Sequence, residues 1–231
     1  MDLGAGVRRK KTLARCLEYD LIRHAGAPQG LPNRWSFRKN AAMRIAPESL
    51  LLALTLGAPT AGALDAYDET LQLQGVTFRV HCDNGASLNT LTLTPSGLEI
   101  DNTPVSAEVD GVVTGAEVAD LNADGSPEVY VYVTSAGSGS YGSLAAWSAN
   151  KKKSLSMIHL PDLAEDPVHG RGYMGHDELA VAGHYLVRSF PVYEEGNTNA
   201  APTGGIRQLQ YRLEPGEAAW QLVIDRSVKL E

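Results

Sequence analysis

Residues 128–133 read EVYVYV, and this short stretch predicts the fold of the chain. Valine and tyrosine alternate in it, which places the three valines on one face of an extended strand and the two tyrosines on the other. A period of two residues is the mark of a β-strand, because successive side chains of a strand point to opposite sides. The stretch therefore predicts a half-buried strand, with its valines on one face and its tyrosines on the other.

The same alternation recurs on either side of this strand, in residues 76–82 (VTFRVHC), 180–193 and 205–225. Short strands separated by turn signals at regular spacing favour an antiparallel β-sandwich or barrel. No amphipathic helix longer than about two turns is evident. We therefore predict a single all-β domain, an antiparallel β-sandwich or flattened barrel, with turns at these pairs: Ser96-Gly97, Asp110-Gly111, Asp124-Gly125 and Pro215-Gly216.

The N-terminal quarter of the chain differs from the rest. Residues 48–63 (ESLLLALTLGAPTAGA) combine a short apolar core with an A-x-A ending, which is typical of a secretory signal peptide and too short for a transmembrane helix. We predict a signal peptide at 43–63, cleavage after Ala63 near Leu64, export to the periplasm, and a mature domain at 64–231. A buried helix is the alternative.

Residues 1–42 carry nine Lys/Arg and no clear apolar period. They form an upstream extension that is either a long basic leader region or sequence before the true start codon, and the second interpretation is favoured. Neither belongs to the fold.

Charge narrows the class of partner. Of the 20 Lys/Arg and 27 Asp/Glu residues, ten and four precede the predicted cleavage site, so the mature domain has a net charge of −13. A domain this acidic repels nucleic acid and anionic lipid, and it attracts a cationic partner. The sequence leaves open whether the domain forms a homodimer.

Cys82 is the only cysteine after the cleavage site, which excludes a disulfide within the mature domain. It is in phase with Val76, Phe78 and Val80, so a buried thiol is expected, with an intermolecular bridge as the alternative.

Residues 120–128 (DLNADGSPE) place Asp120, Asn122 and Asp124 at alternate positions before a glycine, and such oxygen ligands can surround Ca²⁺. The loop lacks the glutamate of an EF-hand at its twelfth position, where Val131 stands. Asp-Gly between polar residues is also typical of a hairpin turn. The turn is therefore the favoured interpretation, and no metal is predicted.

Three histidines, His169, His176 and His184, suggest a zinc site only remotely, because no known spacing of zinc ligands is present. The sequence also contains no G-x-S-x-G nucleophile motif. We therefore predict that the protein is not an enzyme and needs no cofactor.

Residues 134–143 (TSAGSGSYGS) follow the valine-tyrosine strand and contain three glycines, four serines and one aromatic residue. Glycine allows a thin, tightly turned loop, serine hydroxyls donate and accept hydrogen bonds, and tyrosine is a frequent anchor in protein interfaces. The composition suits insertion into a cleft of another protein, and a simple hairpin loop is the alternative.

This loop, together with residues 187–213 (VRSFPVYEEGNTNAAPTGGIRQLQYRL), resembles the periplasmic inhibitors of invertebrate-type (i-type) lysozyme. The likeness covers essentially the whole mature region. It implies a β-sandwich or flattened barrel whose loop enters the active-site cleft of i-type lysozyme and blocks peptidoglycan hydrolysis, which would protect the bacterial cell wall against host innate immunity.

By position, the resemblance makes Ser138 and Tyr141 the contact residues, with Ser140 beside them and Gly137 and Gly139 shaping the backbone. The runner-up is a calcium-dependent carbohydrate-binding or adhesion module.

Overall fold

The structure, a computed structural model, describes residues 65–230. The predicted upstream extension at 1–42, the signal peptide at 43–63 and its cleavage site lie outside the described residues. Within residues 65–230, no helix has the length and apolar character needed to cross a membrane.

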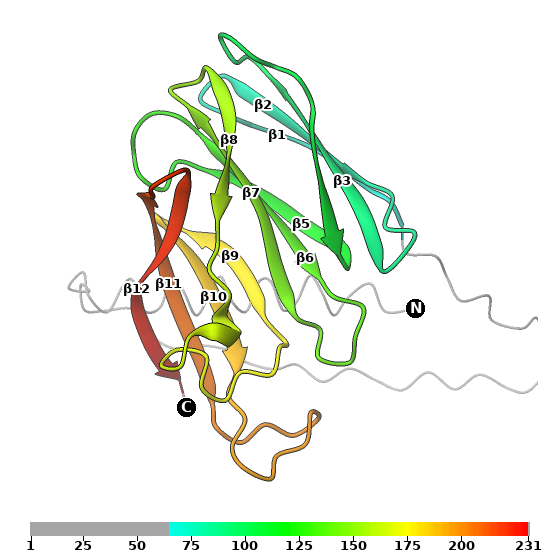
Figure 1. Cartoon of the computed structure of the whole chain (residues 1–231), viewed down its shortest axis with the longest axis vertical. Helices are drawn as coiled ribbons and strands as arrows, with labels where there is room; N and C mark the ends of the chain where they lie inside the picture. The colour runs from blue at the N-terminus through cyan, green and yellow to red at the C-terminus, as the bar shows by residue number, and fades with distance from the viewer. Residues whose placement is uncertain (1–64, 231) are drawn as a thin grey trace, which may run out of the picture. The chain divides into compact units, whose positions relative to one another are not determined.

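Twelve strands and one short 3-10 helix form the described part of the chain (Figure 1). Their bounds are β1 (Tyr67–Leu73), β2 (Val76–Cys82), β3 (Leu88–Ser96), β4 (Val105–Asp110), β5 (Val112–Ala119), β6 (Glu128–Thr134), β7 (Gly142–Asn150), β8 (Ser154–His159), η1 (Leu163–Glu165), β9 (Glu178–Ala182), β10 (Tyr185–Pro191), β11 (Ile206–Pro215) and β12 (Trp220–Leu230). Positive φ angles at Gly97, Gly111 and Gly125 confirm three of the predicted turns.

The strands form two sheets. The first has the order β1-β2-β3-β4 and is antiparallel throughout, and the second has the order β5-β6-β7-β8-β12-β11-β10-β9. One pair in the second sheet, β8 with β12, is parallel over two residues at Trp220 and Gln221.

The eight-stranded sheet curls until its two outer strands approach each other. The Val181 N–H of β9 donates to the Glu117 carboxylate of β5 at 2.7 Å, and the Tyr132 hydroxyl of β6 donates to the same carboxylate. A nearly closed, barrel-like sheet therefore packs against a smaller one. The prediction of a single all-β domain, sandwich or flattened barrel, is confirmed, and features of both are present.

Strand β6, the EVYVYV stretch, separates two hydrophobic cores. Val129, Val131 and Val133 pack between the two sheets with side chains of β2 and β3. Tyr130 and Tyr132 point the other way, into the interior of the curled sheet, where they pack with residues of β10, β11 and β12. All six residues from Glu128 to Val133 are buried, so the prediction of a half-buried strand is wrong for β6, which is covered on both faces.

Cys82 lies at the end of β2 in the first core and is fully buried as a free thiol. The prediction of a buried thiol is confirmed. With no exposed surface, the sulfur is not available for a bridge to a second molecule in the folded state.

Candidate functional site

The loop between β6 and β7, residues 135–141, is closed by its own hydrogen bonds. The Ser135 N–H donates to the Tyr141 carbonyl at 2.9 Å, and the Tyr141 N–H donates to the Ser135 hydroxyl at 2.9 Å. A turn at the tip is closed by the Ser140 N–H, which donates to the Gly137 carbonyl at 2.9 Å. Ser138 is exposed at this tip, and 47% of Tyr141 is exposed beside it.

A second segment, residues 173–177, contacts the backbone of the β6–β7 loop. The His176 N–H donates to the Gly139 carbonyl at 2.7 Å, and the Asp177 carboxylate accepts the Gly142 N–H at 2.8 Å. The two segments touch so closely that a Cβ on Gly175 would collide with the Gly139 carbonyl oxygen, and Gly175 also has a φ of +87°. The loop is therefore tied to its neighbour at backbone level.

A third segment, the long connection between β10 and β11, holds the tip. The Asn199 side-chain amide donates to the Ser138 carbonyl at 2.8 Å, and its oxygen lies 3.1 Å from Nε2 of His176. Asn199 is itself fixed, because its carbonyl accepts the Tyr193 hydroxyl at 3.0 Å. The backbone of Ser138 is thus held in place while its hydroxyl group stays on the exposed side.

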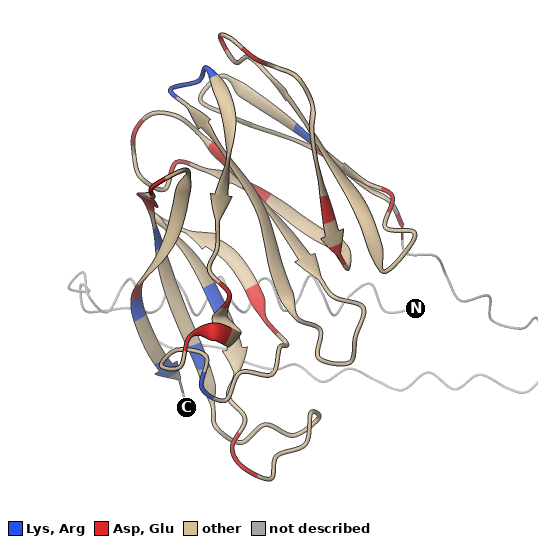
Figure 2. Cartoon of the chain, viewed as in Figure 1, with Lys and Arg blue, Asp and Glu red and all other residues tan. Residues whose placement is uncertain are grey.

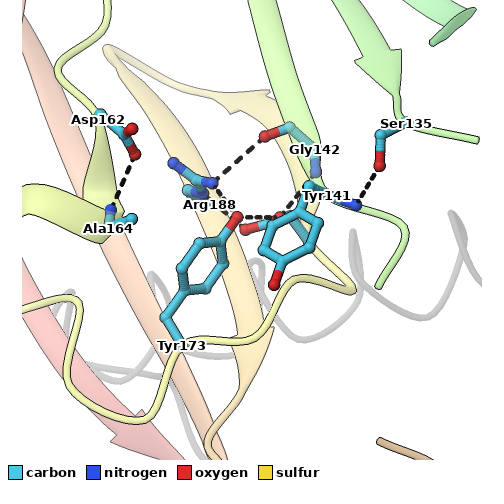
Figure 3. A network of polar contacts seen from close by, with 8 residues as sticks. Ser135, Tyr141, Gly142, Asp162, Ala164, Tyr173 and Arg188 are labelled. Atoms are coloured by element: carbon cyan, nitrogen blue, oxygen red, sulfur yellow. Dashed lines mark hydrogen bonds and ion pairs between the residues drawn. The ribbon is translucent and has the colours of Figure 1, made fainter. Parts of the chain in front are cut away.

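A buried ion pair underlies the loop (Figure 3). Arg188 of β10 donates through Nε to Asp177 at 2.7 Å, and their side chains are 5% and 0% exposed. Arg188 Nη2 also donates to the Gly142 carbonyl at 3.2 Å and to the Tyr173 hydroxyl at 2.6 Å. The Tyr173 hydroxyl in turn donates to Asp177 at 2.6 Å. The buried Asp177 carboxylate and the Tyr173 hydroxyl are therefore both hydrogen-bonded next to the Arg188 charge, as a buried ion pair requires.

The environment fixes the protonation states of this network. Burial alone would lower the pKa of Arg188, but the hydrogen bond to Asp177 and its negative charge outweigh burial and raise the pKa above its usual range. Burial, and then the hydrogen bond to Asp177, raise the pKa of the Tyr173 phenol. Arg188 is therefore a permanent cation, and Tyr173 remains a neutral hydrogen-bond donor.

An aromatic column links the loop to the second core. The Tyr141 ring meets the Tyr173 ring edge-on with centroids 5.7 Å apart, and Tyr173 meets Phe190 in the same way at 5.0 Å. Phe190 is buried, Tyr173 is half-buried and Tyr141 is exposed, so the column runs from the core to the surface. Tyr141 presents an aromatic surface that is oriented before any partner arrives.

The loop lies within the part of the chain that resembles a known family. Residues 102–170 match the family model of the periplasmic lysozyme inhibitor of I-type lysozyme (PliI). The resemblance seen in the sequence is confirmed over these residues, which include β4 to β8 and the whole β6–β7 loop. No curated protein matches the chain. The description of the matching family model is that of an inhibitor.

Of the loop glycines in the PliI segment, Gly139 has a clear steric reason. A Cβ at Gly139 would collide with the Tyr141 ring, whereas one at Gly137 would meet no atom within 4 Å. Ser140 adopts a positive φ of 43°, which closes the turn. The structure thus shows why position 139 favours glycine, and it places no comparable restriction on position 137.

Sequence reasoning missed the residues that hold the loop: Tyr173, Asp177, Arg188 and Asn199. Arg188 carried a usable signal, because it alternates with Leu186 and Phe190 on one face of β10, where a charged residue is expected to be paired. The others lie more than 30 residues from the loop in sequence, and only the fold shows that they meet it.

The three histidines do not form a metal site in the described residues. His169 pairs with Asp166 at 2.8 Å, which helps to lower the pKa of Asp166 to about 2, after the larger effect of the His169 backbone N–H. His176 bonds the loop and Asn199 instead. Within residues 65–230, the only group of His, Cys, Asp and Glu side chains close enough to share a metal ion is Asp120, Asp124 and Glu128, at the β5–β6 turn.

Proposed function

We propose that the protein inhibits i-type lysozyme by inserting the β6–β7 loop into the active-site cleft of the enzyme. The observation that carries the proposal is the position of Ser138 and Tyr141, which are exposed on a loop whose backbone is fixed from three sides. The PliI match over the same loop supplies the class of partner.

A fixed loop favours tight binding. Ordering a flexible segment at an interface costs free energy, and a loop that is already held by Asp177, His176 and Asn199 avoids much of that cost. The rigid Tyr141 ring adds large contact area with few rotatable bonds. These are the properties of a segment that fills a cleft without rearrangement.

The chemistry of the loop fits the cleft of a lysozyme. Such enzymes place two carboxyl groups across the cleft, one protonated and one ionised. The Ser138 hydroxyl can donate to the ionised group or accept from the protonated one, and the Tyr141 ring can occupy a site shaped for a sugar ring.

A lytic assay tests this function. Purified protein is added to i-type, c-type and g-type lysozymes acting on a suspension of bacterial cell walls. We expect clear inhibition of the i-type enzyme and much weaker effects on the other two classes. Absence of inhibition of several i-type lysozymes at micromolar protein, or equal inhibition of all three classes, would contradict the proposal.

Association should slow as salt rises. The net charge of −13 over residues 64–231 attracts a cationic lysozyme over long range, and salt screens this attraction over about 8 Å at physiological ionic strength. We expect the association rate in stopped-flow or surface-plasmon measurements to fall between roughly 50 and 500 mM NaCl, with little change in the dissociation rate. A constant association rate would show that steering is unimportant.

A further inference from the structure

The turn between β5 and β6 gathers three carboxylates at one point. Asp120 and Asp124 lie in the turn and Glu128 begins β6, and one oxygen of each lies within 4.8 Å of the others. Figure 2 shows acidic residues at this turn, at the end of β6 opposite to the β6–β7 loop. Three negative charges at this distance repel one another unless a proton or a cation neutralises them.

Glu128 supplies the second, independent observation. Its side chain is fully buried, and one oxygen, Oε2, accepts the Leu121 N–H at 2.9 Å and the Tyr130 hydroxyl at 3.5 Å. The other oxygen, Oε1, is buried without any hydrogen-bond partner among the described residues. A buried carboxylate oxygen without a partner is costly, and in native proteins an ordered water or an ion satisfies such an atom.

The turn holds its carboxylates in fixed directions. The Asp124 and Gly125 N–H groups donate to the two oxygens of Asp120 at 3.0 and 2.9 Å, and the Ser126 N–H donates to Asp124 at 2.8 Å. Gly125 has the positive φ, +82°, that bends the chain around this point. The acidic groups are thus arranged before any ion binds.

We propose that residues 120–128 bind Ca²⁺, with carboxylate oxygens of Asp120, Asp124 and Glu128 as the protein ligands. Hard oxygen donors in an irregular arrangement suit Ca²⁺, which takes six to eight oxygens in flexible geometry, better than Mg²⁺, which demands a regular octahedron. Water completes the coordination on the exposed side, since Asp124 is exposed.

The proposed ion stabilises the fold and does not take part in inhibition. The turn and the β6–β7 loop are separated by the seven residues of β6, roughly 20 Å of extended chain. Calcium at the turn would fix the start of β6, the strand that both cores share.

Thermal melts and calorimetry test the site. Protein dialysed against EDTA is titrated with CaCl₂, and we expect one bound ion and a rise in Tm of about 3 °C or more at millimolar calcium. Asp124→Asn and Glu128→Gln should each remove the rise. Because Glu128→Gln can alter folding by itself, the exposed Asp124→Asn is the decisive variant, and Asp83→Asn, on the surface outside the turn, is the control that should keep the full rise.

Three results would overturn the proposal: no heat and no Tm shift with the wild-type protein, a shift that survives in Asp124→Asn, or an equal shift with MgCl₂. Inhibition of i-type lysozyme by the folded protein should persist in EDTA. Its loss on chelation, with the melting curve still cooperative, would contradict the separation of the two sites, whereas failure of calcium binding alone would leave the inhibitor function intact.

Discussion

Replacing Tyr141 with alanine is expected to weaken binding to i-type lysozyme by about 2 kcal/mol or more, roughly a thirtyfold loss of affinity. Tyr141 is the large exposed aromatic side chain of the β6–β7 loop, and Tyr173 already orients its ring. Removing an oriented aromatic anchor takes away contact area at the centre of the proposed interface, where binding energy concentrates.

The Ser138→Ala change tests the polar part of the same interface. We expect a loss of roughly 1 to 3 kcal/mol of binding free energy, because a polar group of the lysozyme would be left buried and unpaired. The backbone carbonyl of Ser138 keeps its bond to Asn199 in this variant, so the loop should retain its shape.

Binding loss without unfolding is the result to look for. Titration calorimetry and thermal melts on the same samples should show weaker binding with a Tm within a few degrees of wild type. Ile100→Ala removes a large apolar side chain outside the loop that is even more exposed than Tyr141, 71% against 47%, and should leave binding unchanged. A Ser138→Ala/Tyr141→Ala double variant that melts normally and inhibits at wild-type strength would place the site elsewhere.

Replacing Arg188 with methionine should destabilise the domain by about 3 to 5 kcal/mol. The change leaves Asp177 as a buried charge without its counter-ion. It also removes the guanidinium group that donates to the Gly142 carbonyl and to the Tyr173 hydroxyl. Chemical denaturation followed by fluorescence measures the effect. Any Arg188→Met protein that does fold should also inhibit poorly, since the base of the loop has lost its support.

Arg79→Met is the matched control for this prediction. Arg79 and Asp68 form an ion pair as well, with two hydrogen bonds of 2.9 and 2.6 Å, but their side chains are 59% and 43% exposed. Solvent screens such a pair, so we expect little change in stability. Equal destabilisation by the two substitutions would show that burial of the Arg188–Asp177 pair is not what makes it important.

Local patterns in the sequence predicted the strands and the exposed loop, because alternation and turn residues act over a few positions. Burial of both faces of β6 was not predictable in this way, since the second cover is a sheet made of β1 to β4. The parallel contact between β8 and β12 and the curling of the large sheet likewise depend on segments far apart in the chain.

In the candidate sites, too, local sequence patterns predicted some features, whereas others depend on segments far apart in the chain. The composition of residues 134–143 indicated the loop, but its supports come from Asp177, Arg188 and Asn199, which only the fold brings near. At the β5–β6 turn, the EF-hand pattern predicts an acidic ligand at the twelfth position, which is Val131 in this chain. The buried acidic residue is Glu128, at the ninth position. A glutamate as the first residue of a strand with large valine and tyrosine side chains on its two faces was the signal that could have found it.

Strand β6 gives one face to each hydrophobic core and carries the β6–β7 loop at its end. Unfolding of one core should therefore destabilise the other, because it exposes one face of a strand that both cores share. We therefore expect residues 65–230 to unfold in a single cooperative transition, with neither core melting before the other. We also expect the β6–β7 loop, whose backbone is bonded to two other segments, to resist proteases for as long as those bonds hold.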